Sequence, residues 1–215
     1  MNCGGGENKP SAAEAAAGQA GETLIMIETP YGKIKAKLYN STPQHRDNFI
    51  KLANEGFYDG LLFHRVIPGF MIQGGDPQSK GAAPDKRLGM GGPGYTIPAE
   101  IGAKHFRGAI AAARTGGASN PEKRSSGSQF YIVQNGLSPQ NDQVINQKKA
   151  QGVVYSQAEL DFYNKVGGYP GLDGEYTVFG QVLEGMDVVD KIAAVPRGSG
   201  DRPKEDVTMK VKILK

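Results

Sequence analysis

Apolar and polar residues alternate along several short stretches of the chain, with the period of two that is typical of half-buried β-strands. Residues 23–27 (TLIMI) and 33–38 (KIKAKL) are two such stretches. Turn-forming residues lie between them, so we expect a hairpin here. Residues 177–183 (TVFGQVL) and 207–214 (VTMKVKIL) alternate in the same way and predict two further strands.

A longer stretch that begins at Leu61, LLFHRVIPGFMIQGGDP, contains two apolar runs separated by Pro-Gly and closed by two glycines. This order predicts a strand, a turn and a second strand. Alternation then places Leu61, Phe63 and Arg65 on one face of the first strand, and Met71 with Gln73 on one face of the second. A surface with one cation and one amide among apolar groups suits a largely apolar ligand that is held at one polar point.

Two stretches have apolar residues at helical spacing. In residues 42–55, Thr42 can cap a helix, Pro43 suits its first turn and Gly56 ends it. Residues 185–193 show the same spacing. Many strands with two isolated helices, and no regular alternation of strand and helix, predict a mainly β fold. We expect a closed antiparallel barrel capped by the two helices.

Composition limits the possible functions. With 38% hydrophobic residues, 31 Gly and 13 Pro, the 215-residue chain is typical of a loop-rich globular domain. The net charge of +3 is scattered, whereas nucleic-acid sites need clustered basic residues, so we expect no nucleic-acid partner. No apolar run reaches the ~18 residues of a membrane span. One cysteine and three histidines without ligand spacing predict no metal.

A glycine pattern in the chain formally matches a nucleotide site. Gly89, Gly91 and Gly94 fit G-x-G-x-x-G, but no strand is predicted before them, and residues 95–98 (YTIP) follow where a helix should begin. We therefore expect no nucleotide and no other cofactor.

Three separated blocks carry a resemblance: FHRVIPGFMIQGGDP at 63–77, SQFYIV at 128–133 and LDGEYTVFG at 172–180. Together they resemble the cyclophilin-type peptidyl-prolyl cis-trans isomerases, and especially bacterial lipoprotein-type members with an insertion before the LDG block. The resemblance implies a domain over residues 23–215, with an insertion at 138–168. It also implies an eight-stranded barrel with its site on the outer wall and no cofactor.

The resemblance implies a role for ten residues. Arg65 and Gln73 match the catalytic positions. The remaining positions bind the substrate: Phe70, Met71, Tyr131 and Leu172 match the proline pocket, Gln129 with the Ala113 and Arg114 backbone matches the peptide anchor, and Tyr176 stands where many members have a histidine.

Chemistry makes Arg65 the central residue of this hypothesis. When an X-Pro bond twists, the prolyl nitrogen gains a lone pair, so a donor aimed at that nitrogen binds the transition state more strongly than the ground state. The alternative for Arg65 is a surface ion pair with Asp59 or Asp76. Because isomerisation transfers no proton, we interpret His64 as a hydrogen-bonded wall residue. His45 and His105 are both expected at the surface.

Four positions depart from the family pattern. Arg114 replaces a common asparagine and could add charge near the bound peptide. Tyr131 replaces a phenylalanine, and its hydroxyl needs a partner. Gly171 replaces a common tryptophan and Tyr176 a histidine, so we expect weak binding of cyclosporin-like macrocycles.

The insertion contains one predicted helix. Ser156 and Glu159 form a capping box before apolar residues at helical spacing, and a Gly-Gly pair follows. Because this helix lies shortly before Leu172, it could pack against the pocket rim. A surface insertion without such a role is the other interpretation.

Residues 1–22 have the composition of a flexible tether, and Cys3 lies near their start. This resembles the start of a mature bacterial lipoprotein, which implies a lipid on Cys3 and a place in the cell envelope. A plain flexible tail on a cytoplasmic protein is the alternative.

The sequence thus predicts a monomeric prolyl isomerase that acts on exposed X-Pro bonds of unfolded or flexible polypeptides and assists folding. The rival function is a non-catalytic proline-peptide-binding or holdase module on the same scaffold. A small-molecule barrel is disfavoured, since Arg65 and Gln73 would then lie inside an apolar interior.

Overall fold

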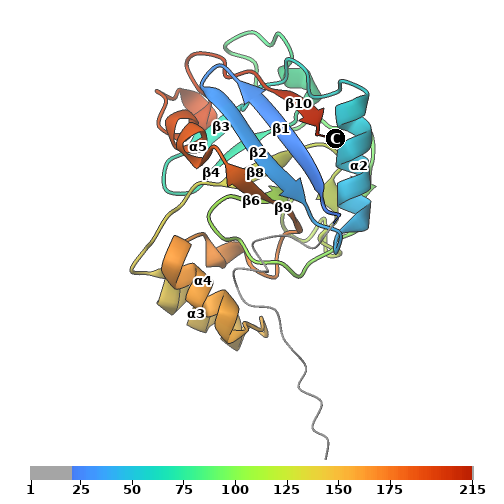
Figure 1. Cartoon of the computed structure of the whole chain (residues 1–215). Coiled ribbons are helices and arrows are strands. Elements are labelled where there is room, and N and C mark those ends of the chain that lie inside the picture. Colours follow the sequence, from blue (N-terminus) through green and yellow to red (C-terminus); the bar gives the residue numbers. More distant parts are fainter. Residues whose placement is uncertain (1–20, 215) are drawn as a thin grey trace, which may run out of the picture.

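The computed structural model describes residues 21–214 (Figure 1). Cys3 and nearly all of the expected tether lie outside these residues. Within them, no helix has the length and apolar content needed to cross a membrane.

An eight-stranded antiparallel sheet forms the body of the protein, in the order β10-β1-β2-β9-β6-β8-β4-β3. Its strands are β1 (Thr23–Thr29), β2 (Gly32–Leu38), β3 (Arg65–Ile67), β4 (Met71–Gly74), β6 (Ala109–Ala112), β8 (Phe130–Val133), β9 (Val178–Glu184) and β10 (Lys210–Ile213). The predicted hairpin is confirmed, since β1 pairs with β2 from Thr23 opposite Leu38 to Thr29 opposite Gly32. Two short strands, β5 (Thr96–Ile97) and β7 (Ser125–Ser126), pair separately.

The closed barrel is not confirmed, and the sheet is a curled half-barrel. Its edge strands, β3 and β10, are not paired with each other. Only the residues before them meet, at a single antiparallel bridge between Leu62 and Thr208. Main-chain hydrogen bonds join residues 60–63 to 207–209, such as Phe63 N–H to the Val207 carbonyl at 2.9 Å, but they do not continue into β3 or β10, which begin at Arg65 and Lys210.

The same irregularity makes one predicted face wrong. Leu61 and Phe63 are buried in the main core, whereas the Arg65 side chain is 42% exposed. Alternation from Leu61 to Arg65 fails because residues 61–64 do not form a regular strand.

Both predicted helices, α2 (Pro43–Asn54) and α5 (Met186–Ala193), are present; in Figure 1, α2 lies to the right of the strands and α5 to their left. Each places its apolar stripe in the main core: Phe49, Leu52 and Ala53 from α2, and Val188, Val189, Ile192 and Ala193 from α5. Pro43 occupies the first turn of α2 as predicted.

Period-two alternation gives the central strands two apolar faces. On β6 and β8, Ile110 and Ile132 belong to the main core, while Ala111 and Tyr131 belong to a second, smaller cluster on the opposite face. Met71 of β4 joins that second cluster. The face that α2 and α5 leave uncovered therefore carries an apolar patch of its own.

The insertion holds two helices, α3 (Asn141–Ala150) and α4 (Gln157–Val166), which lie together beneath the sheet in Figure 1. The capping box of α4 is confirmed, with the Ser156 hydroxyl accepting from the Glu159 N–H at 3.2 Å. The sequence missed α3, because that helix is mostly polar, has no side-chain N-cap and buries Ile145 as its only strongly apolar residue.

Candidate active site

A cavity of about 170 Å³ opens on the second apolar cluster. It brings together all of the predicted site residues except Gln129. Its lining comprises Arg65, Phe70, Met71, Gln73, Ala113, Arg114, Tyr131, Leu172 and Tyr176. These residues come from β3, β4, the turn between them and β8, and from the segments after β6 and before β9, so folding assembles them from distant parts of the chain.

The turn between β3 and β4 lets neighbouring side chains share this cavity. Gly69 adopts a φ of 72°, which few residues other than glycine tolerate. Phe70 follows immediately, and its carbonyl accepts from the Gln134 N–H at 2.8 Å. The Phe70 ring packs at 4.5 Å from the Tyr169 ring, centroid to centroid. Phe70 and Met71 therefore both line the cavity although they are adjacent in sequence.

Arg65 lies at the polar end of the cavity, directly opposite Gln73 in the β3–β4 pairing. Its Nη1 is 3.5 Å from Gln73 Oε1, and its Nε is 3.9 Å from an Asp201 carboxylate oxygen. The sequence missed Asp201. The predicted alternatives are engaged elsewhere: Asp59 pairs with a lysine, and Asp76 accepts main-chain N–H groups.

A chain of amides fixes how Gln73 faces Arg65. Gln129 Nε2 donates to the Gly91 carbonyl at 2.7 Å, so Gln129 Oε1 is free to accept. Gln73 Nε2 donates to that oxygen at 3.1 Å. Gln73 Oε1 must then point toward the guanidinium. Gln129 thus does not line the cavity itself but positions Gln73, which does.

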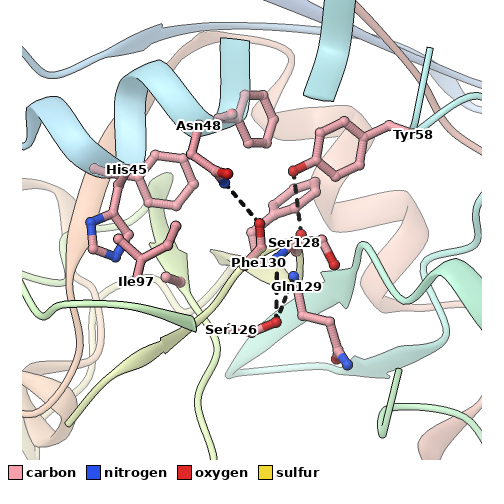
Figure 2. A pocket seen from close by; sticks show the side chains of 12 residues that line it. His45, Asn48, Tyr58, Ile97, Ser126, Ser128, Gln129 and Phe130 are labelled. Carbon is pink, nitrogen blue, oxygen red and sulfur yellow. Dashed lines mark hydrogen bonds between the residues drawn. The ribbon is translucent and has the colours of Figure 1, made fainter. Parts of the chain in front are cut away.

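The backbone around Gln129 is held by hydrogen bonds with three side chains (Figure 2). The Ser126 hydroxyl accepts from the Gln129 N–H at 3.1 Å, Asn48 of α2 donates to the Gly127 carbonyl at 2.7 Å, and Tyr58 donates to the Ser128 carbonyl at 3.4 Å. The void among these residues measures about 10 Å³, which holds about one water at most. This segment is therefore a rigid support for the site.

The peptide-anchor positions differ from one another. Both main-chain groups of Ala113 are used within the protein, its N–H toward the Gln129 carbonyl and its C=O toward the Ser126 N–H. The N–H and C=O of Arg114 have no hydrogen-bond partner within residues 21–214. Of the two, Arg114 is the residue whose backbone remains available to a peptide.

The Arg114 guanidinium does not project toward that position as a free charge. It donates to the Glu175 carbonyl at 2.9 Å and to the Glu175 carboxylate at 3.1 Å, and it lies 4.6 Å from the centre of the Tyr176 ring. Its side chain is only 9% exposed. The charge is therefore neutralised at the cavity rim.

The hydrogen-bond partner of the Tyr131 hydroxyl is His105, which was expected at the surface. His105 Nε2 lies 2.9 Å from the hydroxyl, and His105 is fully buried. Burial raises the pKa of Tyr131 well above its ordinary value, so the hydroxyl stays neutral. The prediction for His105 was wrong because a lone histidine gives no periodic signal of its burial.

The other two histidines are buried as well. His45, also expected at the surface, is 2% exposed, and its Nδ1 lies 2.6 Å from a Glu100 carboxylate oxygen. His64 is 4% exposed, and neither ring nitrogen has a hydrogen-bond partner within residues 21–214. Burial lowers the pKa of His64. His64 is thus a wall residue as predicted, but it is not hydrogen-bonded through its ring.

A second cavity, of about 1060 Å³, continues beyond Arg65. It shares Arg65 and Gln73 with the first cavity and is otherwise lined by His64 and two loops around residues 84–89 and 198–206. The Arg65 guanidinium therefore lies between the smaller cavity and a larger groove. This geometry can hold one ring while the chain that carries it passes over Arg65.

Comparison with known proteins places this geometry in a family. The family described as "Cyclophilin type peptidyl-prolyl cis-trans isomerase/CLD" matches residues 24–213. A Staphylococcus aureus protein named "Putative peptidyl-prolyl cis-trans isomerase" is 36% identical over 192 residues, which cover 89% of this chain and 91% of that protein.

Solved structures show the same similarity to cyclophilin-type isomerases. The crystal structure of a cyclophilin-type isomerase from Cryptosporidium parvum has a TM-score of 0.65 and 26% identity, and the match covers 90% of this chain and 98% of that one. The same isomerase in the presence of the dipeptide Ala-Pro gives a TM-score of 0.64, with 89% of this chain and 99% of that chain covered. This chain belongs to the cyclophilin-type peptidyl-prolyl cis-trans isomerase family.

Proposed function

We propose that the protein turns X-Pro bonds in the 170 Å³ cavity, with Arg65 as the donor to the prolyl nitrogen and Gln73 as the residue that orients it. The observation that carries this proposal is the placement of the Arg65 guanidinium in one cavity with a group of aromatic and apolar side chains. Phe70, Met71 and Leu172 would hold the proline ring. The Ala-Pro dipeptide used with the Cryptosporidium relative supports a proline-containing substrate.

The height of the rotation barrier sets how much free energy the donor and the pocket must supply together. Uncatalysed rotation crosses a barrier of ~18–20 kcal/mol and takes ~10–100 s. Millisecond turnover requires a reduction of about 6 kcal/mol. One preorganised donor supplies about 3–4 kcal/mol. The apolar pocket supplies the rest, because a planar amide is more dipolar than a twisted one and loses more from poor solvation.

We also propose that the substrates are exposed X-Pro segments of unfolded or flexible polypeptides. The groove beyond Arg65 supports this, since it offers room for residues flanking the proline. The filled main core gives no support to a small-molecule barrel. Under this proposal the protein works as a monomer and assists folding.

The test compares isomerisation of an Ala-Pro peptide by Arg65→Ala and by Arg46→Ala. Arg46 is a matched control because it lies on α2 and contacts Asp47 and Asn40. We expect Arg65→Ala to lose about two to three powers of ten in kcat/KM, as for removal of one preorganised donor. Equal rates in both variants, with peptide binding retained, would favour the non-catalytic binding or holdase function.

The proposed envelope location rests on Cys3 and the Gly- and Ala-rich residues that follow it. Under this proposal a lipid on Cys3 anchors the domain, and residues 1–22 act as the tether. Expression of the full-length gene in a bacterium fed labelled fatty acid tests it. Label that persists in Cys3→Ser would refute the attachment site, and absence of label from the wild type would favour a cytoplasmic protein.

A further inference from the structure

A buried carboxylate joins the insertion to the proline pocket. Asp173 directly follows the pocket residue Leu172 and is fully buried. It accepts from the His105 N–H at 2.8 Å, from the His105 ring at 2.9 Å, and from the hydroxyls of Tyr155 at 2.9 Å and Tyr163 at 2.7 Å. Both tyrosines belong to the insertion, one just before α4 and one within it.

The direction of the protons follows from these contacts. The Asp173 oxygens act as acceptors, so His105 Nδ1 carries the proton that it shares with them. In the neutral ring His105 Nε2 is then an acceptor, and the Tyr131 hydroxyl donates to it. Every proton in the series points from the pocket wall toward Asp173.

The hydroxyls of Tyr155 and Tyr163 remain donors under ordinary conditions. Burial, followed by the Asp173 charge, raises the pKa of both tyrosines above the ordinary value. Asp173 is therefore held by two donors of the insertion, and it in turn fixes which His105 nitrogen carries the proton.

We infer that Asp173, His105 and the two insertion tyrosines form a positioning relay that fixes the Tyr131 ring in the proline pocket. This inference rests on the proposed role of Tyr131 as a pocket wall. The insertion would thus be part of the substrate site, although none of its residues lines the 170 Å³ cavity.

The relay satisfies the hydrogen-bonding need of the Tyr131 hydroxyl within the protein. A tyrosine in a pocket must satisfy its hydroxyl, and a water recruited for this task would take up space that the proline ring needs and so weaken proline binding. Donation to His105 satisfies the Tyr131 hydroxyl within the protein. The pocket keeps a ring with a fixed position and needs no water.

The test is a double-mutant cycle on peptide binding and turnover. In Asp173→Asn the two His105 donors keep the side-chain oxygen on their side, so the amide NH2 group faces the hydroxyls of Tyr155 and Tyr163 and the insertion no longer donates to residue 173. We expect the KM and Kd of an Ala-Pro peptide to rise about fivefold, the effect of one hydrogen bond, with kcat within about twofold. In the Tyr131→Phe background the same change should have less than about twofold effect.

Tyr155→Phe serves as the second variant, since Tyr155 is only partly buried and its loss leaves three donors on Asp173. Tyr155→Phe should also raise KM, and this rise should again become small in the Tyr131→Phe background. Tyr31→Phe, at the β1–β2 turn, is the matched control. Nitrogen NMR should find the proton of His105 on Nδ1 in the wild type.

Equal rises in KM with and without the Tyr131 hydroxyl, or no rise in either relay variant, would overturn the relay. So would a wild-type proton on His105 Nε2. These outcomes differ from failure of the proposed catalysis, because Kd and the nitrogen spectrum are measured without turnover. Failure of the catalytic proposal would show only in the Arg65 variant.

Discussion

Replacement of Gln73 by Met removes the middle of the amide chain and keeps nearly the same length and volume. Gln73 donates to Gln129 at 3.1 Å and accepts from Arg65 at 3.5 Å. Without the donor, the side-chain oxygen of Gln129, a residue 5% exposed, loses its partner. An unsatisfied buried acceptor costs about 1–3 kcal/mol, so we expect that loss in the free energy of unfolding.

The effect on catalysis follows from the acceptor side of Gln73. A 3.5 Å contact is at the long limit of a hydrogen bond, so its own contribution is small. Its loss nevertheless leaves Asp201, 3.9 Å away, as the neighbouring acceptor for the guanidinium. Arg65 would then turn toward the larger groove and away from the prolyl nitrogen. We expect kcat/KM to fall about tenfold, equivalent to about 1.4 kcal/mol.

Protease-coupled isomerisation of an Ala-Pro peptide and urea unfolding measure the two effects separately. Gln157→Met is the matched control, since Gln157 lies on α4 and contacts Asp161 at 2.8 Å. A kcat/KM within twofold of the wild type, in a protein that does lose stability, would show that Gln73 does not orient Arg65. The lost stability would then belong to Gln129 alone.

Three further predictions concern stability and ligands. Gly75 has a φ of 90°, and an added Cβ would overlap the Ser128 carbonyl, so Gly75→Ala should cost about 3 kcal/mol in urea unfolding; Gly81→Ala, with open space, should cost about 1 kcal/mol. Burial lowers the pKa of His64, so the unfolded chain binds the proton more readily; stability should decrease as pH falls below 6.5, and less so in His64→Leu. Because Gly171 replaces the family's common tryptophan, calorimetry should detect only weak binding of cyclosporin-like macrocycles.

Where the chain forms regular strands, the sequence was sufficient to place the site residues. Met71 and Gln73 share one face of β4 as alternation predicts, and both line the cavity. Leu172 and Tyr176 lie outside regular strands, so only the family resemblance could bring them to the site. Both residues line the cavity, and their roles stay predictions.

The features that the sequence missed depend on contacts between distant residues. Asp201 approaches Arg65 from an exposed loop, and nothing in its neighbourhood indicates that contact. His105 is buried because Asp173 and Tyr131 satisfy both of its nitrogens, which no local pattern reveals. Helix α3 has the polar composition of a solvent-exposed segment, so periodicity could not distinguish it from a loop.

The two faces of β4, β6 and β8 explain why a cavity forms on the face of the sheet away from α2 and α5. One face packs on the main core with α2 and α5, which holds these strands rigid. The other face carries the second cluster, which would be an exposed apolar patch without further cover. Tyr169 and Leu172, in the segment just after the insertion, cover part of that cluster. The part left open is the 170 Å³ cavity, so the segment that follows the insertion borders this cavity.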